Sequence, residues 1–245
     1  MAMRICITND DGIHAEGLLR LVEWAQKLGE VVVYAPKVEQ SGKSHGIELH
    51  HAIEVKETVV PGAARAFMVD STPADCVRFA LLGAFEQFDL IISGINRGCN
   101  IGQDIIYSGT VGAAFEAAAL GCPRTMAVST EPESLDTAIA HLDQVWDYIQ
   151  KHALFEKCRI WNVNIPGEVK GDIAITRQGG PYYSDDFAAE GDDMFMPVGK
   201  ILYKPSQHLL FDTDAVLTRR CISLTPLTID RTDWSVYRAC CSEAE

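Results

Sequence analysis

The stretch RICITNDDGIHAEG (Arg4–Gly17) decides the fold of this chain. A mostly apolar run ends in Asn9-Asp10-Asp11-Gly12, and a helical pattern begins a few residues later, which predicts a strand, a tight turn and a helix. Ligands of an open parallel sheet bind outside the carboxyl ends of its strands. The first strand therefore delivers two adjacent carboxylates to the edge of the sheet where a binding site is expected.

Asp10 and Asp11 stand side by side, and adjacent carboxylates repel each other unless they are protonated, solvated or neutralised by a cation. A divalent metal ion is the simplest source of that positive charge. Asn, Asp and Gly are also common turn formers, so turn chemistry explains this motif equally well when it is taken alone. The other motifs of the chain must decide between the two interpretations.

Composition and charge set the class of protein. The chain has 245 residues, of which 47% are hydrophobic and 22% charged, and no segment approaches the ~20 apolar residues of a membrane span. The first strand begins at Arg4 and leaves no room ahead of it for a secretory signal, so we expect a soluble, cytoplasmic protein. The formal net charge of −13 argues against a nucleic-acid-binding surface. The eight cysteines show no C-x-x-C spacing, which favours buried thiols over disulfides or a zinc site.

Helical and strand patterns alternate as far as about Pro166. After the first helix, the strand EVVVYAP leads into a loop that carries Ser41. A right-handed crossover places this strand parallel to the first, so Ser41 arrives near the two aspartates. A later buried run, FDLIISGIN, ends in Asn96 at the same edge. The alternation predicts a Rossmann-like α/β fold, with a doubly wound, mostly parallel sheet and helices on both faces.

Other segments are less regular. IELHHAIEV and RAFMV are predicted to form a hairpin and a returning strand around a Pro-Gly turn. Beyond Pro166, GDIAITR and CISLTPL indicate strands, the acidic stretch between them at 179–200 is predicted to be loop-rich, and TDWSVYRACCSEAE indicates a short helix with an acidic end. We therefore divide the chain into a catalytic core at 1–166 and a β-rich extension at 167–245, which we expect to act as an oligomerisation arm.

A second informative stretch, NRGCNIGQDIIYSGTVGAAFEAAALGCP, covers residues 96–123. Its glycines and polar residues lead into a helix of small residues that Gly121 and Pro123 terminate. A glycine-rich loop before a helix N-terminus presents free N–H groups and the positive end of the helix dipole, which suits a phosphate. Neither the P-loop pattern nor the G-x-G-x-x-G dinucleotide fingerprint is present.

Oxygen-bearing side chains from three loops meet at one edge of the predicted sheet. They belong to Asp10, Asp11, Ser41 and Asn96. Hard oxygen ligands suit Mg²⁺, Mn²⁺ or Ca²⁺ better than zinc or copper. Two carboxylates neutralise a divalent cation, and the hydroxyl and amide add no charge, so the cation can still attract a phosphate dianion. The sequence predicts one divalent metal ion per subunit, Mg²⁺ or Mn²⁺, with Ca²⁺ as an alternative.

Several motifs resemble those of the SurE-like survival-protein phosphatases or nucleotidases: ITNDDGIHAEGL, APKVEQSGKS, STPADCV, DLIISGINRGCNIGQDIIYSGTVGAA, VNIP with ITR, and SLTP. They span almost the whole chain, and the long motif is far more specific than turn chemistry. The resemblance implies a metal on Asp10, Asp11, Ser41 and Asn96. It also implies that the substrate phosphate faces Asn100, Ser108, Gly109 and Thr110. To these we add Gly42 and Ser44 as substrate-binding residues, and we assign catalysis to Asp10, Asp11, Asn96 and Ser108.

The resemblance also implies an activity. Members of this family hydrolyse phosphomonoesters, typically nucleoside 5'- and 3'-monophosphates, and some trim polyphosphate. They use Mn²⁺ or Mg²⁺ and form dimers or tetramers through exchanged C-terminal segments. We therefore expect a phosphatase with a small-molecule phosphomonoester substrate, no nucleic-acid or membrane partner, and a homodimeric or homotetrameric assembly. The family usually has Gly at position 71, polar residues at 45, 46 and 48, and Gly-Tyr or Gly-Phe where Arg220-Cys221 stands; the predicted metal ligands match its pattern.

Other classes of protein fit less well. A signalling receiver module needs a phosphoacceptor Asp and a Lys at strand ends where this chain has neither, and a haloacid-dehalogenase-type phosphatase needs D-x-D. The motifs alone do not distinguish an enzyme from a non-catalytic, metal-dependent nucleotide-binding protein. His14 and His45 are candidates to donate a proton to a leaving group, although solvated loop histidines are equally consistent with their positions.

Overall fold

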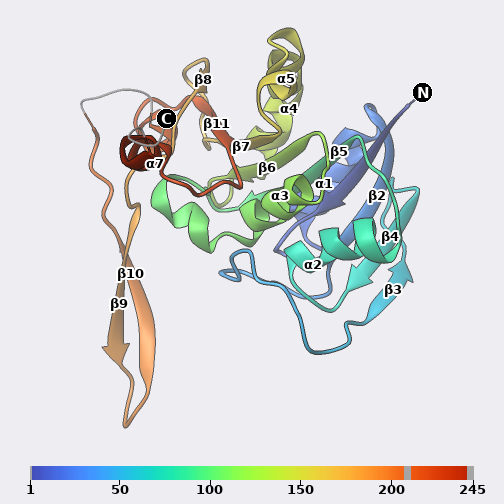
Figure 1. Cartoon of the computed structure of the whole chain (residues 1–245), viewed down its shortest axis with the longest axis horizontal. Coiled ribbons are helices and arrows are strands. Elements are labelled where there is room, and N and C mark those ends of the chain that lie inside the picture. The colour runs from blue at the N-terminus through green and yellow to red at the C-terminus, as the bar shows by residue number, and fades with distance from the viewer. Residues whose placement is uncertain (1, 207–210, 242–245) are drawn as a thin grey trace.

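A computed structural model describes residues 2–206 and 211–241. Its main sheet has nine strands in the order β3-β4-β2-β1-β5-β6-β7-β11-β8, and helices cover both faces (Figure 1). The strands are β1 (Met3–Thr8), β2 (Gly29–Pro36), β3 (Val55–Thr58), β4 (Arg65–Val69), β5 (Leu90–Arg97), β6 (Thr125–Thr130), β7 (Ile160–Ile165), β8 (Ile173–Ile175) and β11 (Ile222–Leu227). The helices are α1 (Glu16–Ala25), α2 (Pro73–Arg78), the π-helix η1 (Phe79–Gly83), the 3₁₀-helix η2 (Gly102–Tyr107), α3 (Gly109–Ala119), α4 (Leu135–Lys151), α5 (Leu154–Lys157), α6 (Asp212–Leu217) and α7 (Trp234–Cys241). Within this described part, no helix is both long enough and apolar enough to cross a bilayer.

The order of the strands reverses between β1 and β5. From β1 the sheet extends through β2 to β4 on one side, and through β5, β6 and β7 on the other, with every neighbouring pair in this series parallel. Antiparallel pairs flank the series, β3 with β4 and β11 with β7. The predicted doubly wound, mostly parallel fold is confirmed. The crevice at such a reversal is where open α/β sheets bind ligands.

Alternate residues of β1 face opposite helical layers. Ile5 and Ile7 belong to the apolar cluster that includes α1 and α4, whereas Cys6 belongs to the cluster that includes α2 and α3; all three are fully buried. A strand covered on both faces needs apolar side chains at successive positions, which explains its continuous apolar run. This packing holds the end of β1, and the aspartates after it, in a fixed position.

The segment predicted to be loop-rich forms a hairpin instead. Strands β9 (Tyr183–Ala189) and β10 (Phe195–Ile201) pair antiparallel and project from the body of the molecule as an arm (Figure 1). The prediction was wrong because both faces of the hairpin are open, so its sequence carries no alternation of buried and exposed residues. Phe187 and Phe195 are each 64% exposed on this arm.

Two further expectations concern the ends of predicted elements. Most of IELHHAIEV forms no strand, since β3 begins only at Val55; residues 47–54 are held by individual contacts described below. The predicted C-terminal helix is present as α7, and the acidic end expected after it, at 242–245, lies outside the described residues.

The main sheet continues past residue 166, because β8 and β11 complete one of its flanks.

Arg220 has a φ of +54°, a left-handed conformation that glycine adopts most easily. Its guanidinium donates twice to the half-buried carboxylate of Glu131, with Nη2 2.8 Å from Oε2. We expect R220A to lower the free energy of unfolding by about 2 kcal/mol, because it loses this bidentate pair and keeps the backbone strain. R220G also loses the pair but relieves the strain, so it should cost about 1 kcal/mol less. Urea unfolding measures the free energy of unfolding of each variant. Equal losses of stability in R220A and R220G would contradict the prediction.

Candidate functional site

A cleft of about 390 Å³ opens at the carboxyl ends of β1 and β5. Its lining includes the four predicted metal ligands, Asp10, Asp11, Ser41 and Asn96, together with Gly42, Asn100 and Ser108. Glu39, Arg97, Cys99, Asp104, Tyr107, Tyr183, Asp185 and Gly199 complete it. The cleft therefore lies at the reversal of strand order, where the fold predicts a ligand, and the arm β9–β10 borders it.

Asp10 is the most deeply buried of the predicted ligands, at 4% exposure. Burial raises the pKa of its carboxyl group to about 6, with a smaller contribution from Asp11, although Thr110 Oγ1 donates to Asp10 Oδ1 and opposes the shift. A raised pKa means that the surroundings do not stabilise the negative charge fully. A cation at this carboxylate would supply the missing stabilisation.

Asp11 has a buried oxygen that no donor satisfies. Its Oδ2 atom has no hydrogen-bond partner among the described residues. Burial raises the pKa of Asp11 as well, although the Arg97 backbone N–H donates to it. A buried carboxylate oxygen without a partner is costly unless a cation or water contacts it. This atom is the clearest sign that the donor set suits a metal ion.

Ser41 reaches the cleft on the loop that follows β2. The backbone N–H of Gln40 donates to the Asp10 carbonyl oxygen at 2.7 Å, which ties this loop to the first strand end. The Ser41 hydroxyl donates to Glu39 Oε1 at 2.6 Å. Glu39 was not predicted as a site residue, since it lies in an irregular loop where no periodicity indicates its direction. Its carboxylate adds to the negative charge around Asp11.

Asn96 stands where β5 changes register against β6, between Ser93 and Asn96. Such irregularities turn side chains away from the pleat of the sheet. The Asn96 side-chain N–H donates to the Gly98 carbonyl oxygen at 2.7 Å, so its amide oxygen is left available. Asn100 is held by Asn164, whose Oδ1 accepts from the Asn100 backbone N–H at 2.8 Å.

The N-terminus of α3 borders the cleft. Ser108 is its N-cap: its Oγ accepts from the Val111 N–H at 3.1 Å, and its own hydroxyl proton remains free to be donated. Gly109 follows directly against Asp10, because a Cβ at this position would lie 3.2 Å from Asp10 Oδ2. The positive end of the helix dipole thus stands beside the carboxylate pair.

Not every predicted site residue lines the cleft. Thr110 is fully buried and supports Asp10 from behind, and the Ser44 hydroxyl donates to the Ile106 carbonyl oxygen. Ser44 and His45 line a neighbouring cavity of about 410 Å³, which shares Ser108 with the cleft. His14 and His45 are both absent from the cleft lining, and a role for either in protonating a leaving group stays a prediction.

The cleft is strongly acidic. Among the described residues that line it, five are carboxylates, three of them not predicted as site residues (Glu39, Asp104 and Asp185), and Arg97 is the single cationic one. A phosphate dianion would be repelled from such a cleft unless a cation accompanied it. The described residues contain no group of three or more His, Cys, Asp or Glu arranged for a metal. A donor set with two carboxylates, a hydroxyl and an amide oxygen is of a different kind and suits a hard divalent cation.

The fold and the cleft together define a doubly wound α/β protein with an acidic cleft at its topological switch point. The family model of the survival protein SurE matches residues 5–185. A 5'-nucleotidase SurE of Thermococcus gammatolerans is 37% identical, over 94% of this chain and 91% of its own length. One of Clostridium botulinum (strain ATCC 19397 / Type A) is 36% identical over 96% of both chains. The crystal structure of the SurE protein from Aquifex aeolicus superimposes with a TM-score of 0.78 at 29% identity, covering 99% of this chain and 100% of that one. The chain belongs to the SurE family.

Proposed function

We propose that the protein is a metal-dependent phosphomonoesterase that hydrolyses nucleoside 5'- or 3'-monophosphates to the nucleoside and phosphate. One observation carries the proposal: Asp10, Asp11, Ser41 and Asn96, from three strand ends, line one acidic cleft beside the N-terminus of α3. The relatives named 5'-nucleotidase SurE support the same substrate class.

The residues present fit one divalent cation, Mg²⁺ or Mn²⁺ with Ca²⁺ as an alternative. Asp10, Asp11, Ser41 and Asn96 would hold it through oxygen atoms, and the unsatisfied Asp11 Oδ2 supports that fit. When bound, the cation would neutralise the carboxylate pair and polarise the phosphoryl group.

The N-terminus of α3 would supply hydrogen-bond donors to the phosphoryl group. Ser108 lines the cleft and Gly109 is the first residue of α3, so the Ser108 hydroxyl and the Gly109 N–H would donate to phosphoryl oxygens. Donors already in place stabilise the charge that develops there. Asn100 and Gly42 border the same cleft and would confine the phosphate, so that water attacks in line with the leaving oxygen.

The arm fits an assembly of identical subunits. Phe187, Phe195 and Met196 expose apolar surface on β9 and β10 that a monomer leaves in water. We infer a homodimer or homotetramer in which a second copy covers this surface. Light scattering of the full chain tests this, and a strictly monomeric protein would exclude it.

Phosphate release from p-nitrophenyl phosphate, with Mn²⁺ and after removal of metal by EDTA, tests the function directly. We expect turnover with Mn²⁺ and essentially none without it. Nucleotide binding without any turnover would instead identify a non-catalytic nucleotide-binding protein. A panel of 5'- and 3'-nucleoside monophosphates, with polyphosphate added, then identifies the preferred substrate.

Asn96→Ala removes one predicted ligand oxygen without changing the charge of the site. We expect it to weaken Mn²⁺ binding by roughly 10- to 100-fold and to lower turnover at limiting Mn²⁺ accordingly. Calorimetric titration of Mn²⁺ and phosphatase assays over a range of Mn²⁺ concentrations measure both effects. Unchanged turnover in the folded variant would show that Asn96 is no metal ligand.

A further inference from the structure

Residues 37–54, between β2 and β3, carry Ser41 and Gly42 to the cleft without forming a helix or strand. A segment of this kind has no ladder of hydrogen bonds to fix its path, so separate contacts must do so. Backbone atoms supply part of the anchoring: besides Gln40, the Ser44 N–H donates to the Tyr107 carbonyl oxygen at 3.0 Å.

The segment also packs directly on α3. A Cβ at Gly112 would lie 2.5 Å from the Ser44 carbonyl oxygen and 3.0 Å from His45 Cα. Only glycine at this position lets the two backbones approach so closely. The helix that brings Ser108 to the cleft is therefore the surface against which the Ser41 segment rests.

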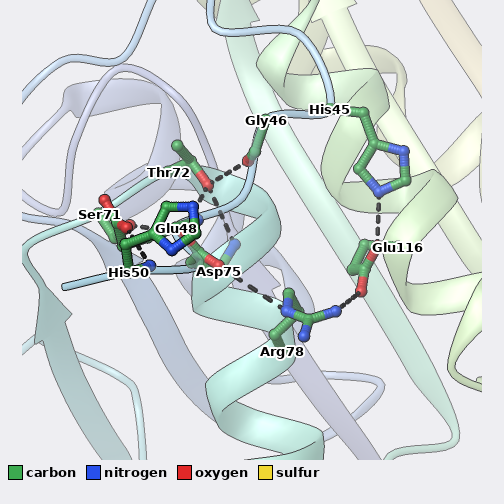
Figure 2. A network of polar contacts seen from close by, with 9 residues as sticks. All are labelled: His45, Gly46, Glu48, His50, Ser71, Thr72, Asp75, Arg78 and Glu116. Atoms are coloured by element: carbon green, nitrogen blue, oxygen red, sulfur yellow. Dashed lines mark hydrogen bonds and ion pairs between the residues drawn. The ribbon is translucent and has the colours of Figure 1, made fainter. Parts of the chain in front are cut away.

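A network of polar contacts around the buried carboxylate of Glu116 lies beyond this contact (Figure 2). Glu116 of α3 is 6% exposed, and its two oxygens lie 2.6 Å from His45 Nε2 and 2.8 Å from Arg78 Nη1. Burial alone would raise the pKa of Glu116, but donation from His45 and Arg78 outweighs it and lowers the pKa. Glu116 is thus a charged, buried acceptor that joins the segment to both α2 and α3, and removing one partner of such a group is costly.

The first turn of α2 holds the next part of the segment. Asp75 is 3% exposed, and its Oδ2 accepts from the Glu48 backbone N–H at 2.8 Å and from the Ser71 hydroxyl at 2.6 Å. The Thr72 hydroxyl donates to the Gly46 carbonyl oxygen at 2.7 Å, and Figure 2 shows these contacts beside the Glu116 network. Arg78 lies between the two carboxylates, with its Nε 3.8 Å from Asp75 Oδ1.

We propose that Glu116, His45 and Arg78 are positioning residues, which hold residues 44–48 against α2 and α3 so that Ser41 and Gly42 stand at the cleft. None of the three lines the cleft itself. The kinetic consequences rest on the proposed function, whereas the position of the segment does not. The network therefore acts on metal and substrate binding through Ser41, and it leaves the phosphoryl-transfer groups in place.

Hydrogen exchange of the metal-free protein tests the position of the segment without any assay of activity. We expect Glu116→Gln to increase exchange at the Ser44 and Glu48 amides by roughly tenfold, because the charged acceptor that anchors their segment is lost. Glu86→Gln is the matched control: the Glu86 side chain is 9% exposed like that of Glu116, and it accepts from Arg4 and Tyr34 at the opposite edge of the sheet. Glu86→Gln should leave the exchange rates of the Ser44 and Glu48 amides unchanged.

Binding and kinetics supply the second readout. Glu116→Gln and His45→Ala should each raise the Mn²⁺ dissociation constant and the KM about tenfold while kcat stays near the wild-type value, as expected when a ligand is held less firmly. His45→Gln keeps an N–H donor and should recover most of the loss. Gly112→Ala pushes the segment away without changing any charge, and should reproduce the weaker binding.

The outcomes separate the two proposals. If amide exchange in the segment stays at the wild-type rate in both Glu116→Gln and Gly112→Ala, the positioning role is wrong whatever the activity. If the variants loosen the segment but the wild-type protein releases no phosphate, the positioning role stands and the proposed function fails. Should Glu116→Gln not fold, His45→Ala and Gly112→Ala decide by the same measurements.

Discussion

Asp11→Asn is expected to raise the Mn²⁺ dissociation constant roughly 10³-fold, and phosphatase turnover at micromolar Mn²⁺ should fall with it. In the wild-type protein, Asp11 Oδ2 is buried and has no hydrogen-bond partner among the described residues. Its negative charge is therefore free to interact directly with a bound cation. The amide keeps the shape but removes that charge. Breaking one side of a largely buried ion pair costs about 3–5 kcal/mol, which corresponds to the stated factor.

Asp70→Asn is the matched control for this loss. Asp70 also follows a parallel strand, β4, at the same edge of the sheet, but it is exposed, pairs with Lys37 at 3.3 Å and lies outside the cleft. It should leave Mn²⁺ affinity and turnover within about twofold of wild type. Calorimetry and steady-state kinetics on both variants make the comparison. If Asp11→Asn and Asp70→Asn showed the same Mn²⁺ affinity and the same turnover, Asp11 would not be a metal ligand.

Asp10→Asn is expected to make the metal-free protein more stable at pH 8, by up to about 3 kcal/mol, although it should also abolish catalysis. The folded pKa of Asp10 is about 6, against an ordinary value of 3.8, so folding disfavours its charged form. A pKa difference of one between the folded and unfolded protein corresponds to about 1.4 kcal/mol. The neutral amide avoids this penalty and can still accept the hydrogen bond from Thr110.

The pH dependence follows from the direction in which the pKa moves. Above pH 6 the wild-type carboxylate is charged in both states and the folded state bears the full penalty; below about 3.8 it is protonated in both and the penalty vanishes. The advantage of Asp10→Asn should therefore shrink as the pH falls from 7 to 4. Urea unfolding in the presence of EDTA measures this difference in stability between Asp10→Asn and the wild-type protein. Added Mn²⁺ should stabilise the wild-type protein more than the variant. A variant less stable than wild type at pH 8 would mean that Asp10 is well stabilised without metal.

The arm β9–β10 and the Glu116 network show where prediction from sequence stops. The arm has no buried face, so no periodic pattern marks its strands. Glu116 lies in a helix of small residues, where a single charged residue is usually read as facing solvent; its partners His45 and Arg78 are distant in sequence. Similarly, Asp185 joins the cleft from a segment that no motif connects to it, whereas Asp104 lies within the long motif that also holds Asn100 and Ser108.

The sequence by itself determined the parallel sheet and the edge at which Asp10, Asp11, Ser41 and Asn96 meet, because period-2 and period-3.6 patterns and the right-handed crossover fix which strand ends lie together. Only the tertiary structure decided which side chains actually face the cleft. Thr110 supports Asp10 and Ser44 anchors a loop, since burial and hydrogen-bond partners depend on segments brought together by folding. Side-chain direction in irregular segments is set by these long-range contacts, and local sequence carries no record of them.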